Sequence, residues 1–143
     1  MSPRVRHRLS LLIGDDDTAV RECVADLVAD RDFEIFMAGT GSESLQILLS
    51  RSIDLTILDV HMPELTGIEV FERFVRGAFI AGPRGAPLAP AGRRLDAIFM
   101  SADATPEVRG WCRTQGRRLL DKPFEPDAMR AAIDAVLTGR STD

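Results

Sequence analysis

Five short apolar runs alternate along the chain with stretches in which apolar residues recur every three or four positions. Within the runs nearly every residue is apolar, a pattern typical of strands that a parallel sheet buries on both faces. The alternation predicts five strands, each followed by a helix, which is the order of an α/β protein. The predicted strands are Leu9–Gly14, Phe33–Ala38, Asp54–Leu58, Leu95–Met100 and Leu119–Leu120.

The stretches between the runs have the periodicity of amphipathic helices. After the first run, five apolar residues share one helical face and are predicted to be buried: Val20, Cys23, Val24, Leu27 and Val28. Cys112 is predicted to be buried in the same way on a later helix, which also carries Trp111 on its apolar face. The last helix is expected to end before Gly139, because glycine is common just past the end of a helix.

Such a chain has two common ways to arrange its strands, a closed barrel or an open sheet. A closed barrel needs eight strand–helix units and typically about 250 residues, whereas this chain has 143 residues. An open, doubly wound parallel sheet in a single domain is therefore predicted, with helices on both faces joined by right-handed crossovers. The domain is expected to span residues 9–138, with short tails at 1–8 and 139–143.

The segment 76–94 interrupts the alternation of predicted strands and helices. Of its 19 residues, 16 are Gly, Pro, Ala or Arg, so the segment has little to contribute to a core. It is predicted to be a long loop inserted within the domain. Phe79 is the one aromatic residue among its arginines, fewer than a nucleic-acid site typically interleaves, which favours a solvated loop.

Composition argues against several classes of protein. The 18 Lys and Arg residues against 22 Asp and Glu give a net charge of −4, which argues against nonspecific binding to nucleic acid or to a membrane surface. The two cysteines lie 89 positions apart and fit neither a zinc motif nor a disulfide framework. No apolar run approaches the ~18 residues of a membrane span, and no secretory signal is present, so a cytoplasmic location is expected.

Polar side chains follow four of the five predicted strands. Asp15 and Asp16 come after the first strand and Asp59 after the third. Ser101 follows the fourth strand and Lys122 the fifth. Because ligands of open α/β sheets bind outside the carboxyl ends of the strands, these side chains are expected to meet at one edge of the sheet.

Three carboxylates in one place repel one another unless a cation lies among them. Oxygen ligands without a His or Cys ligand fit a hard divalent ion, and Mg²⁺ takes one or two carboxylates together with phosphate oxygens. The ammonium of Lys122 and the hydroxyl of Ser101 suit a phosphoryl group, whose charge needs donors on several sides. Phosphoryl chemistry at a carboxylate would form an acyl phosphate.

Four short motifs contain these residues, namely the acidic strand end Leu11–Asp17, the loop Leu55–Pro63 with Gly67, the step Met100–Ala102 and the turn Asp121–Phe124. Together and in this order, they resemble the receiver domain of two-component response regulators, of the chemotaxis-regulator kind. The resemblance covers nearly all of Leu9–Leu137. It implies a flavodoxin-like (βα)5 fold with strand order 2-1-3-4-5 and a cis peptide bond between Lys122 and Pro123.

The resemblance also implies roles for the acidic residues. Asp59 would accept a phosphoryl group from a histidine kinase or a histidine phosphotransfer protein. Mg²⁺ would be bound by Asp16, Asp59 and the backbone carbonyl of His61. Asp15 would act through a metal-bound water, and the imidazole of His61 is expected to point outward.

A signalling switch is implied by the remaining positions. Lys122 would pair with the phosphoryl oxygens, and Ser101 would hydrogen-bond them once Asp59 is modified. The small Ala102 would leave the path to the phosphate open, and Leu119 stands where the family commonly has an aromatic switch residue. The fourth helix, fifth strand and fifth helix would present the signal to a protein target, in a monomer or a phosphorylation-linked homodimer. The chain would catalyse only its own aspartyl phosphorylation and dephosphorylation, and no DNA-binding domain is expected in it.

Two alternatives remain open. Asp15-Asp16-Asp17 also fits the Asp-x-Asp strand end of haloacid-dehalogenase-like phosphohydrolases, although no later Gly-Asp-x-x-x-Asp motif follows a strand and Ala19 stands where Thr or Val is usual. In the receiver interpretation, Asp17 is only the N-cap of a helix. The other alternative is a receiver-like scaffold that works without phosphorylation and is regulated by a partner that binds segment 76–94.

Overall fold

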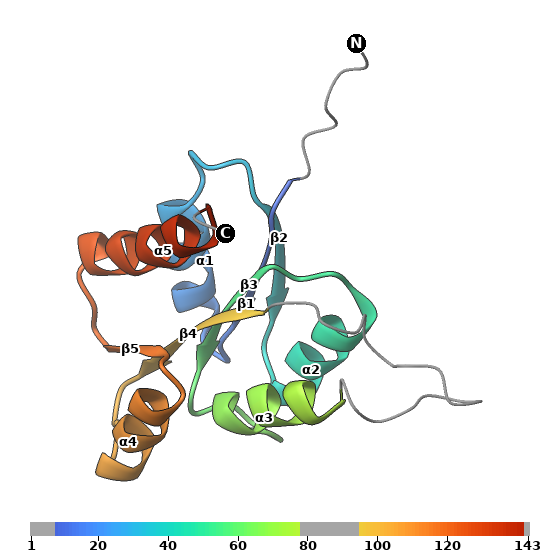
Figure 1. The fold of residues 1–143 in the computed structure, drawn as a ribbon, viewed down its shortest axis with the longest axis vertical. Helices are drawn as coiled ribbons and strands as arrows, with labels where there is room; N and C mark the ends of the chain where they lie inside the picture. Colours follow the sequence, from blue (N-terminus) through green and yellow to red (C-terminus); the bar gives the residue numbers. More distant parts are fainter. Residues whose placement is uncertain (1–7, 78–94, 142–143) are drawn as a thin grey trace.

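The computed structural model describes residues 8–77 and 95–141 of the chain (Figure 1). Strands and helices alternate in the predicted order, and each strand begins and ends within one residue of its predicted bounds. The strands are β1 (Ser10–Gly14), β2 (Glu34–Ala38), β3 (Leu55–Asp59), β4 (Asp96–Ser101) and β5 (Arg118–Asp121). The helices are α1 (Thr18–Leu27), α2 (Gly41–Ser50), α3 (Gly67–Gly77), α4 (Pro106–Thr114) and α5 (Pro126–Ser141).

The five strands form one parallel sheet in the order β2-β1-β3-β4-β5. β1, β3 and β4 are buried along their whole length, as their apolar sequences predict. The edge strands β2 and β5 are more exposed. The predicted fold, a flavodoxin-like open sheet in a single domain with strand order 2-1-3-4-5, is confirmed.

Helices cover both faces of the sheet (Figure 1). α1 and α5 lie on one face, where their side chains Val24 and Ile133 belong to one core. α2, α3 and α4 lie on the other face, where Leu48, Phe71 and Cys112 belong to a second core. None of the helices within the described ranges combines the length and hydropathy that a membrane crossing requires. With both faces covered, the buried central strands β1, β3 and β4 can present functional groups to solvent only at their ends.

Three helices begin close to the carboxyl ends of strands because side chains cap them. Asp17 accepts a hydrogen bond from the N–H of Ala19 at the start of α1. Thr40 and Thr105 cap α2 and α4 in the same way. Such a cap typically stabilises a helix by about 1 kcal/mol. The caps keep the loops at this edge short, which holds the residues before each helix near the strand ends.

One prediction about the core is wrong, because Cys23 is exposed. Val24, Leu27 and Val28 of the same predicted face are buried. The apolar face is wider than the strip of α1 that touches the sheet, so the residue at its margin faces solvent. Cys112 is buried, as predicted.

Two helices are longer than the sequence predicts. α5 continues to Ser141, so the expectation that it ends before Gly139 is wrong. Glycine inside a helix costs only about 1 kcal/mol, and Gly139 does not adopt the left-handed conformation of a residue that terminates a helix. α3 includes Arg76 and Gly77, the first two residues of the predicted loop. The rest of that loop, 78–94, lies outside the described residues.

Candidate functional site

Three carboxylates lie together at the carboxyl end of the sheet. β1 and β3 are neighbours, Asp15 follows β1 directly, and Asp59 is the last residue of β3. One carboxylate oxygen from each of Asp15, Asp16 and Asp59 lies within 4.8 Å of the others. Asp15 and Asp59 are buried whereas Asp16 is exposed, so solvent reaches this acidic cluster from the Asp16 side.

The ammonium group of Lys122, the only lysine in the sequence, lies against the acidic cluster. Its Nζ is 2.5 Å from Oδ2 of Asp15 and 3.3 Å from Oδ2 of Asp59. The backbone N–H of Lys122 donates to the carbonyl oxygen of Ser101 (2.8 Å), which holds the loop after β5 against the end of β4. The peptide bond between Lys122 and Pro123 is cis, as the resemblance implies.

Burial and neighbouring charges set the protonation of these groups. Desolvation of the Asp59 carboxyl, together with the charge of Asp15, raises the pKa of Asp59 even though Lys122 opposes the shift. Burial alone lowers the pKa of Lys122, but its hydrogen bond to Asp15 and the charges of both carboxylates outweigh burial and raise that pKa. Lys122 is therefore held as a cation, and further positive charge at the acidic cluster would favour the ionised form of Asp59.

The donor set fits a hard divalent cation. All three side chains offer carboxylate oxygens, and no His or Cys side chain belongs to the cluster within the described residues. Three carboxylates against one ammonium leave an excess of negative charge that a divalent ion would neutralise. The N–H of His61 donates to Oδ1 of Asp59 (3.3 Å), so the backbone of His61 lies beside the acidic cluster. This chemistry matches Mg²⁺, which typically binds proteins through one or two carboxylates and retains several waters.

Ser101 and Ala102 stand at the end of β4. Ser101 is fully buried, and its Oγ accepts a hydrogen bond from the N–H of Asp103 (3.2 Å). Ala102 is exposed and, with Lys122 and Phe124, lines a cavity of about 400 Å³. The hydroxyl of Ser101 is thus engaged in its own loop, while open space lies beside the Lys122 side chain.

The imidazole of His61 is exposed, as predicted. Its Nε2 lies 3.4 Å from the carbonyl oxygen of Asp103. The contact links the loops that follow β3 and β4. His61 thus lies beside the acidic cluster with its backbone while its side chain faces solvent.

Leu119, which stands where the family commonly has an aromatic residue, packs against the core beneath α4. It pairs with Phe99 between β5 and β4. The ring of Phe99 meets Trp111 of α4 edge to face with centroids 5.3 Å apart, and both rings contact Phe71 of α3 in the same way. Trp111 is therefore a core-packing residue, as predicted, and it provides the aromatic contact between α4 and the sheet.

Arg21 contributes to the site although no motif identifies it. Its Nη1 donates to the carbonyl oxygen of Asp15 (2.5 Å) and its Nη2 to Oγ1 of Thr18 (2.9 Å). Helical side chains lean toward the N-terminus of their helix, so a long side chain one turn into α1 reaches back to the acidic turn. That spacing is the signal in the sequence from which Arg21 could have been found.

Gly67 allows the chain to pass directly over the backbone of Asp59. A Cβ atom at Gly67 would lie 2.4 Å from the carbonyl oxygen of Asp59, far closer than two such atoms can approach. The N–H of Gly67 donates to the carbonyl oxygen of Val60 (3.0 Å). The glycine therefore places the start of α3 against the end of β3.

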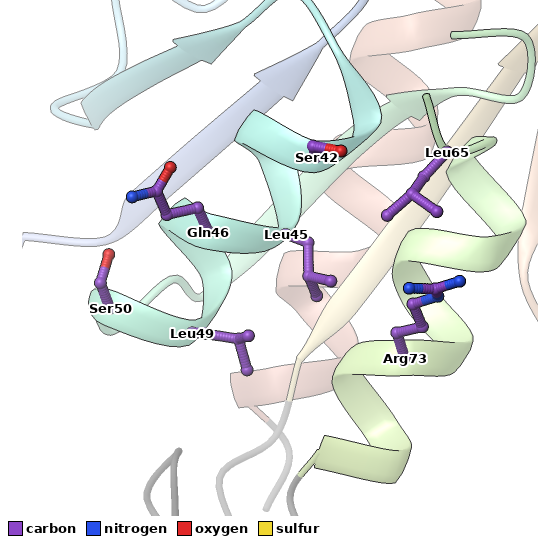
Figure 2. Close-up of a pocket in the computed structure, with 7 residues that line it drawn as sticks. All are labelled: Ser42, Leu45, Gln46, Leu49, Ser50, Leu65 and Arg73. Carbon is purple, nitrogen blue, oxygen red and sulfur yellow. The ribbon is translucent and has the colours of Figure 1, made fainter. Parts of the chain in front are cut away.

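A slightly larger hollow lies between α2 and α3 (Figure 2). Its volume is about 450 Å³, and Leu45, Leu49 and Leu65 form its apolar wall with Arg73 on the α3 side. None of the three clustered carboxylates lines it. The chemistry at the strand ends, and not the size of a hollow, therefore identifies the candidate site.

Comparisons with known proteins find similar domains. The model of the response regulator receiver domain family matches residues 11–134. The chain is 38% identical over 134 residues to response regulator MprA of Mycolicibacterium vanbaalenii, covering 93% of this chain and 52% of MprA. It is 34% identical over 131 residues to the CAI-1 autoinducer sensor kinase/phosphatase CqsS of Vibrio cholerae, covering 91% of this chain and 18% of CqsS. The chain thus spans about half or less of the length of these relatives.

The fold is also similar to a solved chain of the CheX-CheY-BeF3-Mg²⁺ complex from Borrelia burgdorferi, with a TM-score of 0.73 at 19% identity, covering 90% of this chain and 89% of that one. The haloacid-dehalogenase interpretation is wrong, because the chain matches the receiver family, and Asp17, which that interpretation needs as the second acid, caps α1 and does not belong to the acidic cluster. The family match over residues 11–134 includes all four motifs. The chain belongs to the response regulator receiver domain family.

Proposed function

We propose that Asp59 is the phosphoacceptor of a two-component phosphorelay and receives its phosphoryl group from a histidine kinase or a histidine phosphotransfer protein. The observation that carries this proposal is the position of Lys122, whose ammonium lies between Asp15 and Asp59 at 2.5 and 3.3 Å. A cation fixed beside a buried carboxylate at an open sheet edge suits an incoming phosphoryl group, because that group needs positive charge on several sides.

Asp59 supplies the nucleophile for the transfer. Its carboxylate oxygen attacks the phosphorus of the donor phosphohistidine, so that a P–O bond forms while the P–N bond breaks. The donor imidazole leaves with the electron pair of that bond and takes up a proton. Since burial raises the pKa of Asp59, cations beside it serve to keep it ionised and reactive.

The site would hold Mg²⁺ through Asp16, Asp59 and the backbone carbonyl of His61, with Asp15 acting through a water. When bound, the ion supplies positive charge to the oxygens of the transferring phosphoryl group. The proposal is supported by the three carboxylates within 4.8 Å. It is also supported by the similar Borrelia structure, which is described as a complex with BeF3 and Mg²⁺.

After transfer, the new group on Asp59 carries a charge of about −1.5 to −2. It competes with Asp15 for the ammonium of Lys122. Ser101 would donate its hydroxyl proton to a phosphoryl oxygen, while its Oγ is also the acceptor for the N–H of Asp103. A movement of Oγ toward the phosphoryl group would therefore pull on the loop that leads into α4, and the small Ala102 leaves room for the phosphoryl group.

The proposed role implies a contact surface for a downstream protein and a location in the cell. The surface of α4, β5 and α5 would contact a downstream protein, and the chain would act in the cytoplasm as a monomer or a phosphorylation-linked homodimer. On this surface, Arg109 of α4 pairs with Asp121 at the end of β5 (2.6 Å), which couples the helix to the residue before Lys122. The domain would span residues 9–138.

Labelling with radioactive acetyl phosphate tests this function. We expect one phosphoryl group per chain in the presence of Mg²⁺, released by hydroxylamine as an acyl phosphate is, and none in EDTA. Asp59→Asn is expected to abolish labelling. Asp17→Asn is the matched control, because Asp17 lies in the same acidic run but caps α1.

Two outcomes would contradict the proposal in different ways. Labelling of Asp59→Asn at the wild-type level would show that another residue accepts the phosphoryl group. A wild-type chain that takes no label at any Mg²⁺ concentration would favour the phosphorylation-independent scaffold regulated through segment 76–94.

A further inference from the structure

Arg21 holds the backbone that carries two of the three clustered carboxylates. Its guanidinium spans two acceptors, the carbonyl oxygen of Asp15 at 2.5 Å and Oγ1 of Thr18 at 2.9 Å. The carbonyl of Asp15 belongs to the peptide unit that joins Asp15 to Asp16. Because a peptide unit is planar, a hydrogen bond that fixes the direction of its carbonyl also fixes the orientation of the plane that contains the Cα atoms of Asp15 and Asp16.

The two carboxylates depend on this contact to different degrees. Asp15 is also held by its own N–H, which donates to the carbonyl oxygen of Ala38 (3.0 Å), and by the ammonium of Lys122. Asp16 is exposed, so core packing does not fix its side chain and its direction follows from the backbone that carries it. Arg21 therefore acts chiefly on Asp16.

The charge of Arg21 is placed where it does not compete for ligand atoms. Its guanidinium donates to a carbonyl and a hydroxyl, whereas Lys122 occupies carboxylate oxygens of Asp15 and Asp59. Arginine stays charged at all physiological pH values, and its planar fork bonds two acceptors at once. The acidic turn thus gains a nearby cation while the oxygens of Asp16 remain available.

We propose that Arg21 is a positioning residue for the divalent cation, which it serves by holding the Asp15–Asp16 peptide so that Asp16 faces the other two carboxylates. The inference rests on the proposed function, because it takes the acidic cluster to be the Mg²⁺ site. Groups that orient metal ligands typically change metal affinity by about 10- to 100-fold when they are removed.

The test compares two variants. Arg21→Gln removes both the charge and the planar guanidinium that donates to two acceptors, whereas Arg21→Lys keeps only the charge. Two quantities are measured for each, the Mg²⁺ dissociation constant by calorimetry and the Mg²⁺ concentration that gives half-maximal labelling by acetyl phosphate. We expect both to rise roughly tenfold in Arg21→Gln and by a smaller factor in Arg21→Lys. Labelling at saturating Mg²⁺ is expected to stay at the wild-type level in both variants.

Arg31→Gln is the matched control, because Arg31 lies just after α1 and pairs with Asp134 away from the acidic cluster. A Mg²⁺ midpoint of Arg21→Gln that equals that of the wild type or of Arg31→Gln would overturn the inference. So would a loss of labelling at saturating Mg²⁺ that follows a loss of folding stability in urea, since Arg21 would then be only structural. Failure of the proposed function is separate from both results, because it appears as a wild-type chain without label.

Discussion

Lys122 reaches from the end of β5 to place its Nζ 2.5 Å from Oδ2 of Asp15, a residue with no exposed surface. Removing one partner of a buried ion pair leaves an uncompensated charge. We therefore expect Lys122→Ala to lower the free energy of unfolding by about 3 kcal/mol in EDTA, and by less in saturating Mg²⁺, which would neutralise the carboxylates. Urea unfolding under both conditions measures the difference.

The control for this variant is Arg109→Ala, which removes the exposed ion pair with Asp121. Exposed pairs contribute little, so its unfolding is expected to change much less and not to depend on Mg²⁺. Equal losses for Lys122→Ala with and without Mg²⁺ would argue against a cation site at these carboxylates. Labelling of Lys122→Ala is expected to persist in Mg²⁺, because Asp59 remains and the ion would keep it ionised, whereas the effect of labelling on the downstream protein is lost.

The raised pKa of Asp59 predicts that ionisation of this carboxyl lowers the free energy of unfolding. Its pKa in the folded state lies above the ordinary value of 3.8, because burial and Asp15 disfavour the ionised form. Stability is therefore lost as the pH rises through the folded-state pKa, and Asp59→Asn avoids this loss. In EDTA, Asp59→Asn is expected to be more stable than wild type at pH 7 by about 1 kcal/mol, a usual size for one substitution.

The difference should shrink as the pH falls through the folded-state pKa and level off below 3.8, where Asp59 is protonated in both the folded and the unfolded chain. Denaturant unfolding at a series of pH values gives this comparison. Asp127→Asn, at an exposed position on α5 outside the acidic cluster, serves as the control. A stability difference for Asp59→Asn that is the same at every pH would contradict the prediction.

Gly67 and Gly110 are expected to respond to alanine in opposite directions. At Gly67 a Cβ would lie 2.4 Å from the carbonyl oxygen of Asp59, so Gly67→Ala must displace α3 from the end of β3. We expect a loss of about 2 kcal/mol, in the range of overpacking substitutions, together with reduced labelling by acetyl phosphate.

At Gly110, in the middle of α4, nothing lies within 4 Å of an added Cβ. Gly110→Ala is therefore expected to raise the free energy of unfolding by about 0.5–1 kcal/mol, because alanine is the better helix former. Thermal unfolding of both variants tests the pair. If both substitutions, or neither, lowered the free energy of unfolding, the close approach of Gly67 to Asp59 would not be what distinguishes the two positions.

The two cysteines are expected to differ in reactivity. Cys23 is exposed, whereas Cys112 is buried and burial raises the pKa of its thiol. One thiol per folded chain should react quickly with 5,5′-dithiobis(2-nitrobenzoic acid), and the second only after unfolding. Cys23→Ser should abolish the fast phase and Cys112→Ala should leave it unchanged. Two fast thiols in the native protein would contradict the burial of Cys112.

Much of the fold could be predicted because its central strands are buried on both faces. Runs such as Leu11–Ile13 and Ala97–Met100 contain no polar residue, so they admit few alternatives once helical stretches alternate with them. The errors lie where weak preferences compete. Exposure of Cys23 depends on how α1 rests on the sheet, and continuation of α5 through Gly139 depends on a difference of about 1 kcal/mol.

The candidate site could be predicted in outline for a topological reason. Polar residues that follow parallel strands must share one edge of the sheet, and this brings Asp15, Asp59 and Lys122 together. The remaining contacts depend on loop conformations that no residue pattern specifies. The bond from Arg21 to the Asp15 carbonyl and the bond from the Asp103 N–H to Ser101 are of this kind.

Few side chains of α4 are buried against the sheet, and this limits how strongly packing fixes the position of the helix. Cys112 is the one fully buried side chain of this helix, and Val108 and Trp111 pack against the core as partly buried residues. A charge-assisted hydrogen bond contributes about 1.5–3 kcal/mol, which is about what full burial of one large apolar side chain contributes. We therefore expect one new bond at the carboxyl end of the sheet to be enough to shift α4, while β1 and β3, which are buried along their whole length, keep the carboxylates in place.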